Sequence, residues 1–139
     1  MNWYIEKLEE IKKNAPIFSV CGDDCSVCPR FLAKSEEELK QTAEFWHKVG
    51  WRESIVSNEE IKCSGCGSNK NCSFNLLYCT KEHGVKKCSD CPQFKCEKLK
   101  NTYKQSFEKM QQCQKVCKSK EEFEMLVRAF YQKEQNMKK

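Results

Sequence analysis

The residues that constrain this chain most are Cys21-Gly22-Asp23-Asp24-Cys25-Ser26-Val27-Cys28-Pro29. The gap of two residues between Cys25 and Cys28 lets two thiolates in one tight turn reach the same ion, while backbone N–H groups point at the sulfur atoms and offset their charge. Asp23 and Asp24 suit turn formation, because their carboxylates accept hydrogen bonds from backbone N–H groups. By itself, one such cysteine pair is a weak indication of a metal site.

The same two-residue spacing occurs twice more, at Cys63/Cys66 and at Cys88/Cys91, with further cysteines close by. Three such pairs in one short chain are a strong indication of metal binding. Zinc, held in a tetrahedron by thiolates at about 2.3 Å, is the usual occupant of such sites. We therefore predict two or three zinc ions and ten candidate ligands: Cys21, Cys25, Cys28, Cys63, Cys66, Cys72, Cys79, Cys88, Cys91 and Cys96.

The spacing leaves open which cysteines share an ion. One option joins the pair at 63/66 to the pair at 88/91, which lie slightly further apart than in most zinc ribbons. A second option is a local set: Cys79, Cys88, Cys91 and Cys96. With this set, the pair at 63/66 would share an ion with Cys72 or with the first cluster, which is Cys21, Cys25 and Cys28. Ten is not a multiple of four, so one site is incomplete or takes another ligand, for which His47 and His83 are candidates.

The spacing Cys21-x3-Cys25-x2-Cys28 also fits three thiolates on an iron–sulfur cluster. Radical S-adenosylmethionine enzymes use this spacing, but they need a barrel larger than 139 residues can build. An electron-transfer or redox-sensing cluster is therefore the main alternative to zinc.

A chain of 139 residues can bury a core large enough to fold without disulfides or metal ions, so its twelve cysteines need a separate explanation. No stretch approaches the roughly 20 apolar residues of a membrane span. Residues 1–7 contain no apolar signal segment, so we expect a cytoplasmic protein in a reducing compartment. There, clustered cysteines are more often metal ligands than disulfides.

The net charge of +5 lies entirely in residues 97–139, which hold 11 basic and 6 acidic side chains. Such a concentration could bind nucleic acid, our second alternative function. However, a zinc ion with four thiolates carries a charge of −2, so two sites would cancel most of the excess. Nucleic-acid binding is thus weakly supported, and the expected partner is an unidentified protein.

The apolar periodicity predicts an α-rich fold with little sheet: a small domain stapled by zinc knuckles, with an antiparallel helical hairpin at the C-terminal end. We expect helices over residues 3–14, 35–50 and 74–83, and a hairpin over 97–139. Capping boxes begin at Ser35, Ser57 and Ser119. The expected division is a cysteine-rich part, 1–96, and a basic hairpin, 97–139, packed as one compact unit.

Cys113 and Cys117 fall on the apolar stripe of the hairpin, together with Met110. They could bind a metal as a pair, but core packing is the simpler role, because free cysteine buries readily. Trp46 and Trp51 are likewise expected in the core. No phosphate loop, zincin helix or nucleophile elbow occurs, so nothing indicates an enzyme. The sequence favours structural zinc sites in an interaction or regulatory module.

Four stretches are similar in order and spacing to one family: Cys21-Gly22-Asp23-Asp24-Cys25-Ser26-Val27-Cys28-Pro29, Ile61-Lys62-Cys63-Ser64-Gly65-Cys66, Cys79 to Val85, and Cys88-Ser89-Asp90-Cys91-Pro92-Gln93-Phe94-Lys95-Cys96-Glu97-Lys98-Leu99. Over roughly residues 17–103 the chain resembles the uncharacterised cysteine-rich proteins of bacteria and archaea grouped as domain of unknown function 3795. The resemblance implies a metal-binding module, expected to take zinc, and no established reaction. Many members carry a further cysteine between the counterparts of Cys72 and Cys79, where this chain offers Asn75.

Overall fold

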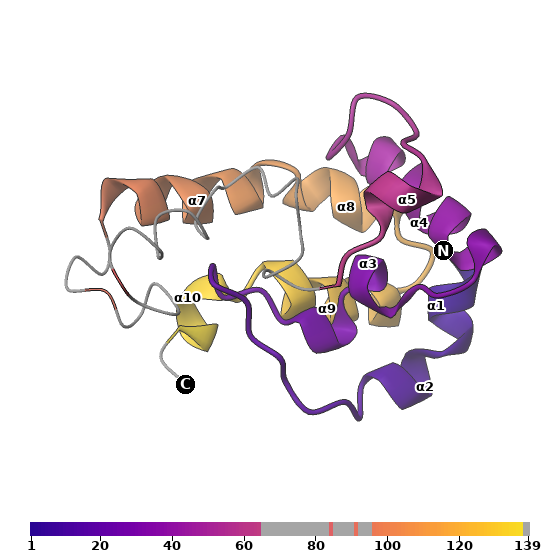
Figure 1. Ribbon diagram of the computed structural model, residues 1–139, viewed down its shortest axis with the longest axis horizontal. Coiled ribbons are helices and arrows are strands. Elements are labelled where there is room, and N and C mark those ends of the chain that lie inside the picture. The colour runs from indigo at the N-terminus through magenta and orange to yellow at the C-terminus, as the bar shows by residue number, and fades with distance from the viewer. Residues whose placement is uncertain (65–83, 85–90, 92–95, 138–139) are drawn as a thin grey trace.

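The computed structural model describes residues 1–64, 84, 91 and 96–137, which are mostly helical (Figure 1). In chain order the elements are α1 (Asn2–Glu6), α2 (Leu8–Ile11), the 3-10 turn η1 (Cys25–Val27), α3 (Pro29–Leu32), α4 (Glu36–Val49), α5 (Asn58–Ile61), α7 (Glu97–Glu108), α8 (Met110–Val116), α9 (Lys120–Phe130) and α10 (Lys133–Asn136). Among these residues there is no strand, only an isolated bridge between Phe18 and Asp24. The α-rich class is confirmed, and the helix expected over 74–83 lies outside the described residues.

Helix α4 begins and ends where its sequence predicts. The Ser35 hydroxyl accepts a hydrogen bond from the Glu38 amide (3.1 Å), and the Glu38 carboxylate accepts one from the Ser35 amide (3.3 Å). This reciprocal pair satisfies N–H groups that have no partner inside the helix. Gly50 ends the helix at φ +95°, a conformation that favours glycine. The buried face carries Leu39, Ala43 and Trp46, as expected.

The other two expected capping boxes are only half formed. Ser57 and Ser119 each accept a hydrogen bond from the amide three residues on. At the Ser119 cap, the Glu122 carboxylate has other partners than the Ser119 amide. It accepts a hydrogen bond from the Lys118 amide (2.9 Å) and pairs with the Met1 ammonium (3.1 Å). Both charges of that ion pair are fully buried. Glu122 therefore ties α9 to the beginning of α1 rather than closing the box.

The continuous helix predicted over residues 3–14 is wrong, because the chain breaks at Lys7. Lys7 leaves the helical conformation (φ −103°, ψ 6°), and its ammonium pairs with Glu38 at 2.8 Å. The buried residues of the two short helices are Trp3, Tyr4, Leu8 and Ile11. Ala15, expected on the same face, is exposed because the second helix has already ended.

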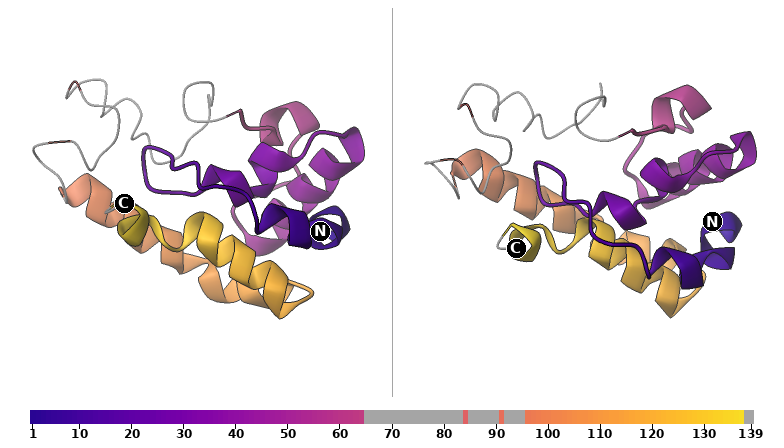
Figure 2. Two further views of the ribbon diagram at one scale, coloured as in Figure 1. Left: turned by 90° about the horizontal axis from the view of Figure 1, so that it is seen from below. Right: turned by 60° about the horizontal axis from the view of Figure 1, so that its bottom comes forward.

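The C-terminal hairpin is confirmed, with a break in each arm. Figure 2 shows α7 and α8 running alongside α9 and α10. Lys109 separates the helices of the first arm at φ −106°, ψ 9°, and Tyr131 ends α9. Leu126 and Ala129 supply the fully buried face of α9. The residues expected on that face, Phe123, Val127 and Phe130, instead pack against the core from partly exposed positions.

An aromatic cluster joins α4 to α9 across the core. The Phe130 ring stands edge-on to Trp46 at 5.7 Å and to Trp51 at 5.4 Å between ring centroids. The two tryptophan rings lie 4.8 Å apart. Core packing, rather than base stacking, is therefore the role of both tryptophans, as the sequence indicated. In the part of the chain that the structure describes, no helix has the length and apolar character needed to cross a membrane.

Candidate metal centre

The cysteine turn, residues 17–28, folds back on itself and carries three of the ten candidate ligands. The Ser19 amide donates a hydrogen bond to the carbonyl of Asp23 (2.8 Å). Gly22 lies between them at φ +95°. The turn predicted from the sequence is thus present, with Cys21 at its tip.

Asp24 organises the turn from inside. Its carboxylate is 1% exposed and accepts four hydrogen bonds. Oδ1 accepts from the Ile17 amide (3.1 Å), from the Ser26 amide (3.1 Å) and from the Ser26 hydroxyl (2.6 Å). Oδ2 accepts from Nε of Arg128 in α9 (3.0 Å). The predicted role of this aspartate as a turn former is confirmed.

The C-terminal hairpin holds the turn from outside. The carbonyl of Ala129 accepts a backbone amide of the turn (2.9 Å), and the Asn136 side chain donates to the Gly22 carbonyl (2.8 Å). The ammonium of Lys133, which is 5% exposed, pairs with the Asp23 carboxylate at 2.6 Å. These contacts join residues more than a hundred positions apart, so no local sequence pattern indicated them.

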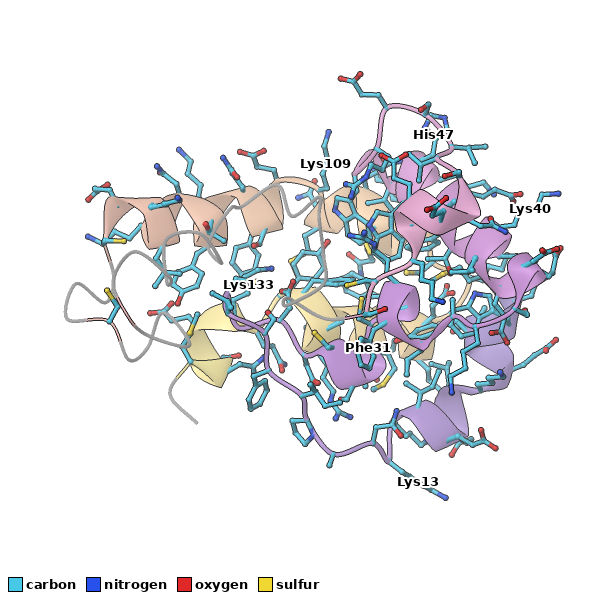
Figure 3. The ribbon with its side chains drawn as sticks, viewed as in Figure 1. Lys13, Phe31, Lys40, His47, Lys109 and Lys133 are labelled. Atoms are coloured by element: carbon cyan, nitrogen blue, oxygen red, sulfur yellow. The ribbon has the colours of Figure 1, made fainter. Side chains whose placement is uncertain are left out.

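The inward direction of Arg128 and Lys133 changes how the basic hairpin is interpreted. Both contribute to the +5 charge of residues 97–139, yet both are paired with acids of the turn. Figure 3 places Lys133 beside the turn, whereas Lys13, Lys40 and Lys109 point away from the body of the protein. Part of the positive charge that suggested nucleic-acid binding therefore holds the cysteine turn inside the protein.

Replacing Gly22 by alanine should destabilise the protein far more than the same change at Gly50, although both have φ +95°. A Cβ at Gly22 would lie 2.4 Å from the backbone carbonyl of Lys133, whereas at Gly50 it would meet only the flexible end of Lys109 at 3.5 Å. We expect a loss of roughly 3 kcal/mol for Gly22→Ala and about 1 kcal/mol for Gly50→Ala. Urea unfolding measures both, and equal losses would contradict the close approach of α10.

The thiol of Cys21 is buried but has polar neighbours. The Ser19 hydroxyl lies 3.2 Å from the sulfur, and the Asp23 amide donates to that hydroxyl at 3.0 Å. Burial, with the Asp23 carboxylate adding to it, raises the pKa of Cys21, and the Lys133 ammonium opposes that rise. The apolar cluster around Cys21 contains Val20, Leu99 and Met137, with Cys96 and Tyr103 packed against it.

The thiol of Cys28 lies in a second environment of the same kind. Burial raises the pKa of Cys28 to about 12. The backbone N–H of Phe31 and the Arg30 guanidinium lower it, while the charges of Asp23 and Cys63 raise it. The Phe31 amide itself donates to the Cys28 carbonyl at 3.1 Å, so Cys28 lies buried at the beginning of α3, beside a backbone N–H and a cation.

Arg30 fixes the approach of Cys63 to this environment. Its Nε donates to the carbonyl of Ile61 at 2.7 Å, and its Nη2 donates to that of Glu60 at 3.4 Å. In return, the Cys63 amide donates to the Arg30 carbonyl at 3.2 Å. Residues 60–63 are therefore held against α3, the helix that follows Cys28.

Within residues 1–64, 84, 91 and 96–137, no three cysteine, histidine or acidic side chains come close enough together to hold an ion. Cys21, Cys25 and Cys28 are all described, so they do not form a joint three-thiolate site in this arrangement. Cys91 and Cys96 are half-buried. The predicted ligands Cys66, Cys72, Cys79 and Cys88, and the alternative ligand His83, lie outside the described residues. His47 is exposed, and its Nδ1 lies 3.2 Å from the Arg52 carbonyl.

Cys113 and Cys117 lie in the core, away from the turn. Cys113 is fully buried, and Cys117 packs against the same cluster from a half-buried position. A hydrogen bond between the two thiols lowers the pKa of Cys113 and raises that of Cys117. Their burial agrees with the packing role expected from the sequence.

The model of a protein family described as protein of unknown function (DUF3795) matches residues 17–101, more than half of the chain. The chain belongs to this family. The DUF3795 match covers the cysteine turn, α3, α4, α5 and the beginning of α7. Arg128, Lys133 and Asn136, which clamp the turn, lie beyond the matched region. Neither the curated proteins nor the solved structures give a match.

Proposed function

We propose that this DUF3795 protein binds zinc through its clustered cysteines and that the zinc has a structural role. The observation that supports it is the surroundings of Cys21 and Cys28. Each thiol is buried, yet a backbone N–H and a cationic side chain close to each sulfur lower its pKa against the effect of burial. Such groups stabilise a thiolate, the form that binds metal, and hold it in a fixed direction. A cysteine that only fills space in a core needs neither.

Two cavities among the described residues lie away from the candidate ligands. One cavity of about 270 Å³ is lined by residues of α1, α4 and α8, and another of about 140 Å³ by residues of α7, α9 and α10. Neither of these two cavities is lined by a candidate cysteine ligand. We propose a module that acts through its surface on a protein partner, with zinc maintaining that surface.

Metal analysis of protein purified without oxygen tests the proposal directly. We expect two or three zinc ions per chain, measured by native mass spectrometry and elemental analysis on the same sample. Cys117→Ser provides a matched control, because Cys117 lies in the hairpin core rather than among the ten candidates. It should keep the full metal content. A chain that binds no metal under these conditions would overturn the proposal.

The same sample separates the alternative functions. A brown protein absorbing near 400 nm, with iron and sulfide in matching amounts, would replace zinc by an iron–sulfur cluster. Binding of nucleic acid that weakens steeply with salt would favour the basic hairpin as the functional surface instead.

A further inference from the structure

We propose that Cys28 and Cys63 bind one metal ion and that Cys21 and Cys96 bind a different one. This inference rests on the proposed metal binding and adds the division of ligands that the sequence leaves open. It agrees with the sequence option that sends the pair at 63/66 to the first cluster, and it differs from the options that keep this pair with later cysteines. It also divides the first cluster, which the iron–sulfur interpretation would keep on one cluster.

The first pair is held together by backbone contacts. Cys63 donates its amide to the carbonyl of Arg30, only two residues after Cys28. The Arg30 side chain closes the connection from the other direction by donating to the carbonyls of Ile61 and Glu60. Two thiolates on neighbouring segments fixed in this way are half of a tetrahedral zinc site.

The second pair is gathered by a separate apolar cluster. Cys21 is 6% exposed and packs with Leu99 and Met137, and Cys96 packs against the same group. Cys96 is the residue from which α7 begins, so Leu99 lies one turn further along that helix. The beginning of α7 therefore places Cys96 against the same apolar cluster that contains Cys21. Met137 closes the cluster from the end of α10.

The two pairs are held by different contacts. Asn136 and Lys133 hold the turn near Cys21, whereas α3 leads away from Cys28 towards residues 60–63. Each pair also has a cation on an adjoining segment, because Lys133 pairs with Asp23 and Arg30 donates to the carbonyls of residues 60 and 61. Because a zinc ion with four thiolates carries a charge of −2, a separate buried or half-buried cation lowers the cost of placing each centre.

Paired cysteine-to-serine variants test this division by the number of zinc ions that remain. Cys28→Ser and Cys63→Ser should each lose one ion, and the double variant should also lose only one. Cys21→Ser with Cys96→Ser should behave in the same way. The cross-combination Cys28→Ser with Cys96→Ser should lose two. If Cys21→Ser with Cys28→Ser loses only one ion, the two cysteines share a site and the proposed division is wrong.

A second measurement on the unmodified protein avoids variants that fail to fold. Zinc is withdrawn stepwise with a chelator while exposed thiols are alkylated, and mass spectrometry identifies the modified cysteines. Cys28 and Cys63 should become reactive with the loss of the same ion, and Cys21 with Cys96 at another step. Simultaneous exposure of Cys21 and Cys28 would overturn the division. An unmodified protein that holds no metal from the beginning would instead overturn the proposed function.

Discussion

Given the proposed structural role of zinc, chelation is expected to lower the free energy of unfolding by about 10 kcal/mol. Structural zinc supplies roughly 10–16 kcal/mol of apparent folding free energy, whereas whole domains are stable by only about 5–15 kcal/mol. The cysteine turn and residues 60–63 should therefore unfold once the metal is removed. Denaturant unfolding with and without chelator measures the loss, and limited proteolysis shows whether residues 17–64 have opened.

The aromatic core should resist chelation better than the turn. Trp46, Trp51 and Phe130 pack against one another without a candidate ligand among them. We expect part of the helical circular dichroism to persist when the metal is gone, and zinc, but not magnesium, to restore the rest. Metal binding releases thiol protons, so the stabilisation should shrink as the pH falls. An unchanged unfolding midpoint in protein shown by mass to be metal-free would contradict a structural role for the ion.

Elements with strong local signals could be predicted from the sequence. Helix α4 carries a capping serine, an apolar stripe and a terminal glycine, and each acts over four residues or fewer. The C-terminal hairpin was likewise predicted from local signals, which are its apolar periodicity and the capping serine Ser119. The breaks at Lys7 and Lys109 were not, because neither position carries a proline or glycine. Packing against other helices, rather than local preference, decides where those helices stop.

The connection between the turn and the hairpin could not be read from the sequence. Arg128 and Asp24 are 104 residues apart, and Asn136 and Gly22 are 114 apart. In the sequence, Arg128 and Lys133 counted only as part of a basic footprint. Asp24 was expected to form a turn, but its partner in α9 was not foreseen. The candidate ligands themselves were found from spacing, whereas their division between ions depends on which segments meet in space.

Replacing Asp24 by alanine is expected to cost about 4 kcal/mol in the metal-loaded protein. The change leaves the partly buried Arg128 guanidinium without a carboxylate, with only the carbonyls of residues 12 and 14 as acceptors. It also removes the acceptor for two amides and the Ser26 hydroxyl. Breaking one side of a buried ion pair typically costs about 3–5 kcal/mol, because the remaining charge has lost both its partner and water. Urea unfolding at constant zinc concentration measures the effect.

Arg128→Met and the double variant Asp24→Ala with Arg128→Met separate the ion pair from the other hydrogen bonds. Removing both charges should cost less than the sum of the two single changes, since no unpaired charge remains. The residual loss then measures the hydrogen bonds that Asp24 accepts from the Ile17 and Ser26 amides together with those that Arg128 donates to the carbonyls of residues 12 and 14. Glu9→Gln is the control, because Glu9 pairs with Lys12 at the exposed surface and should leave stability unchanged. Additive losses would mean that Arg128 and Asp24 act independently, and that α9 does not hold the turn through this pair.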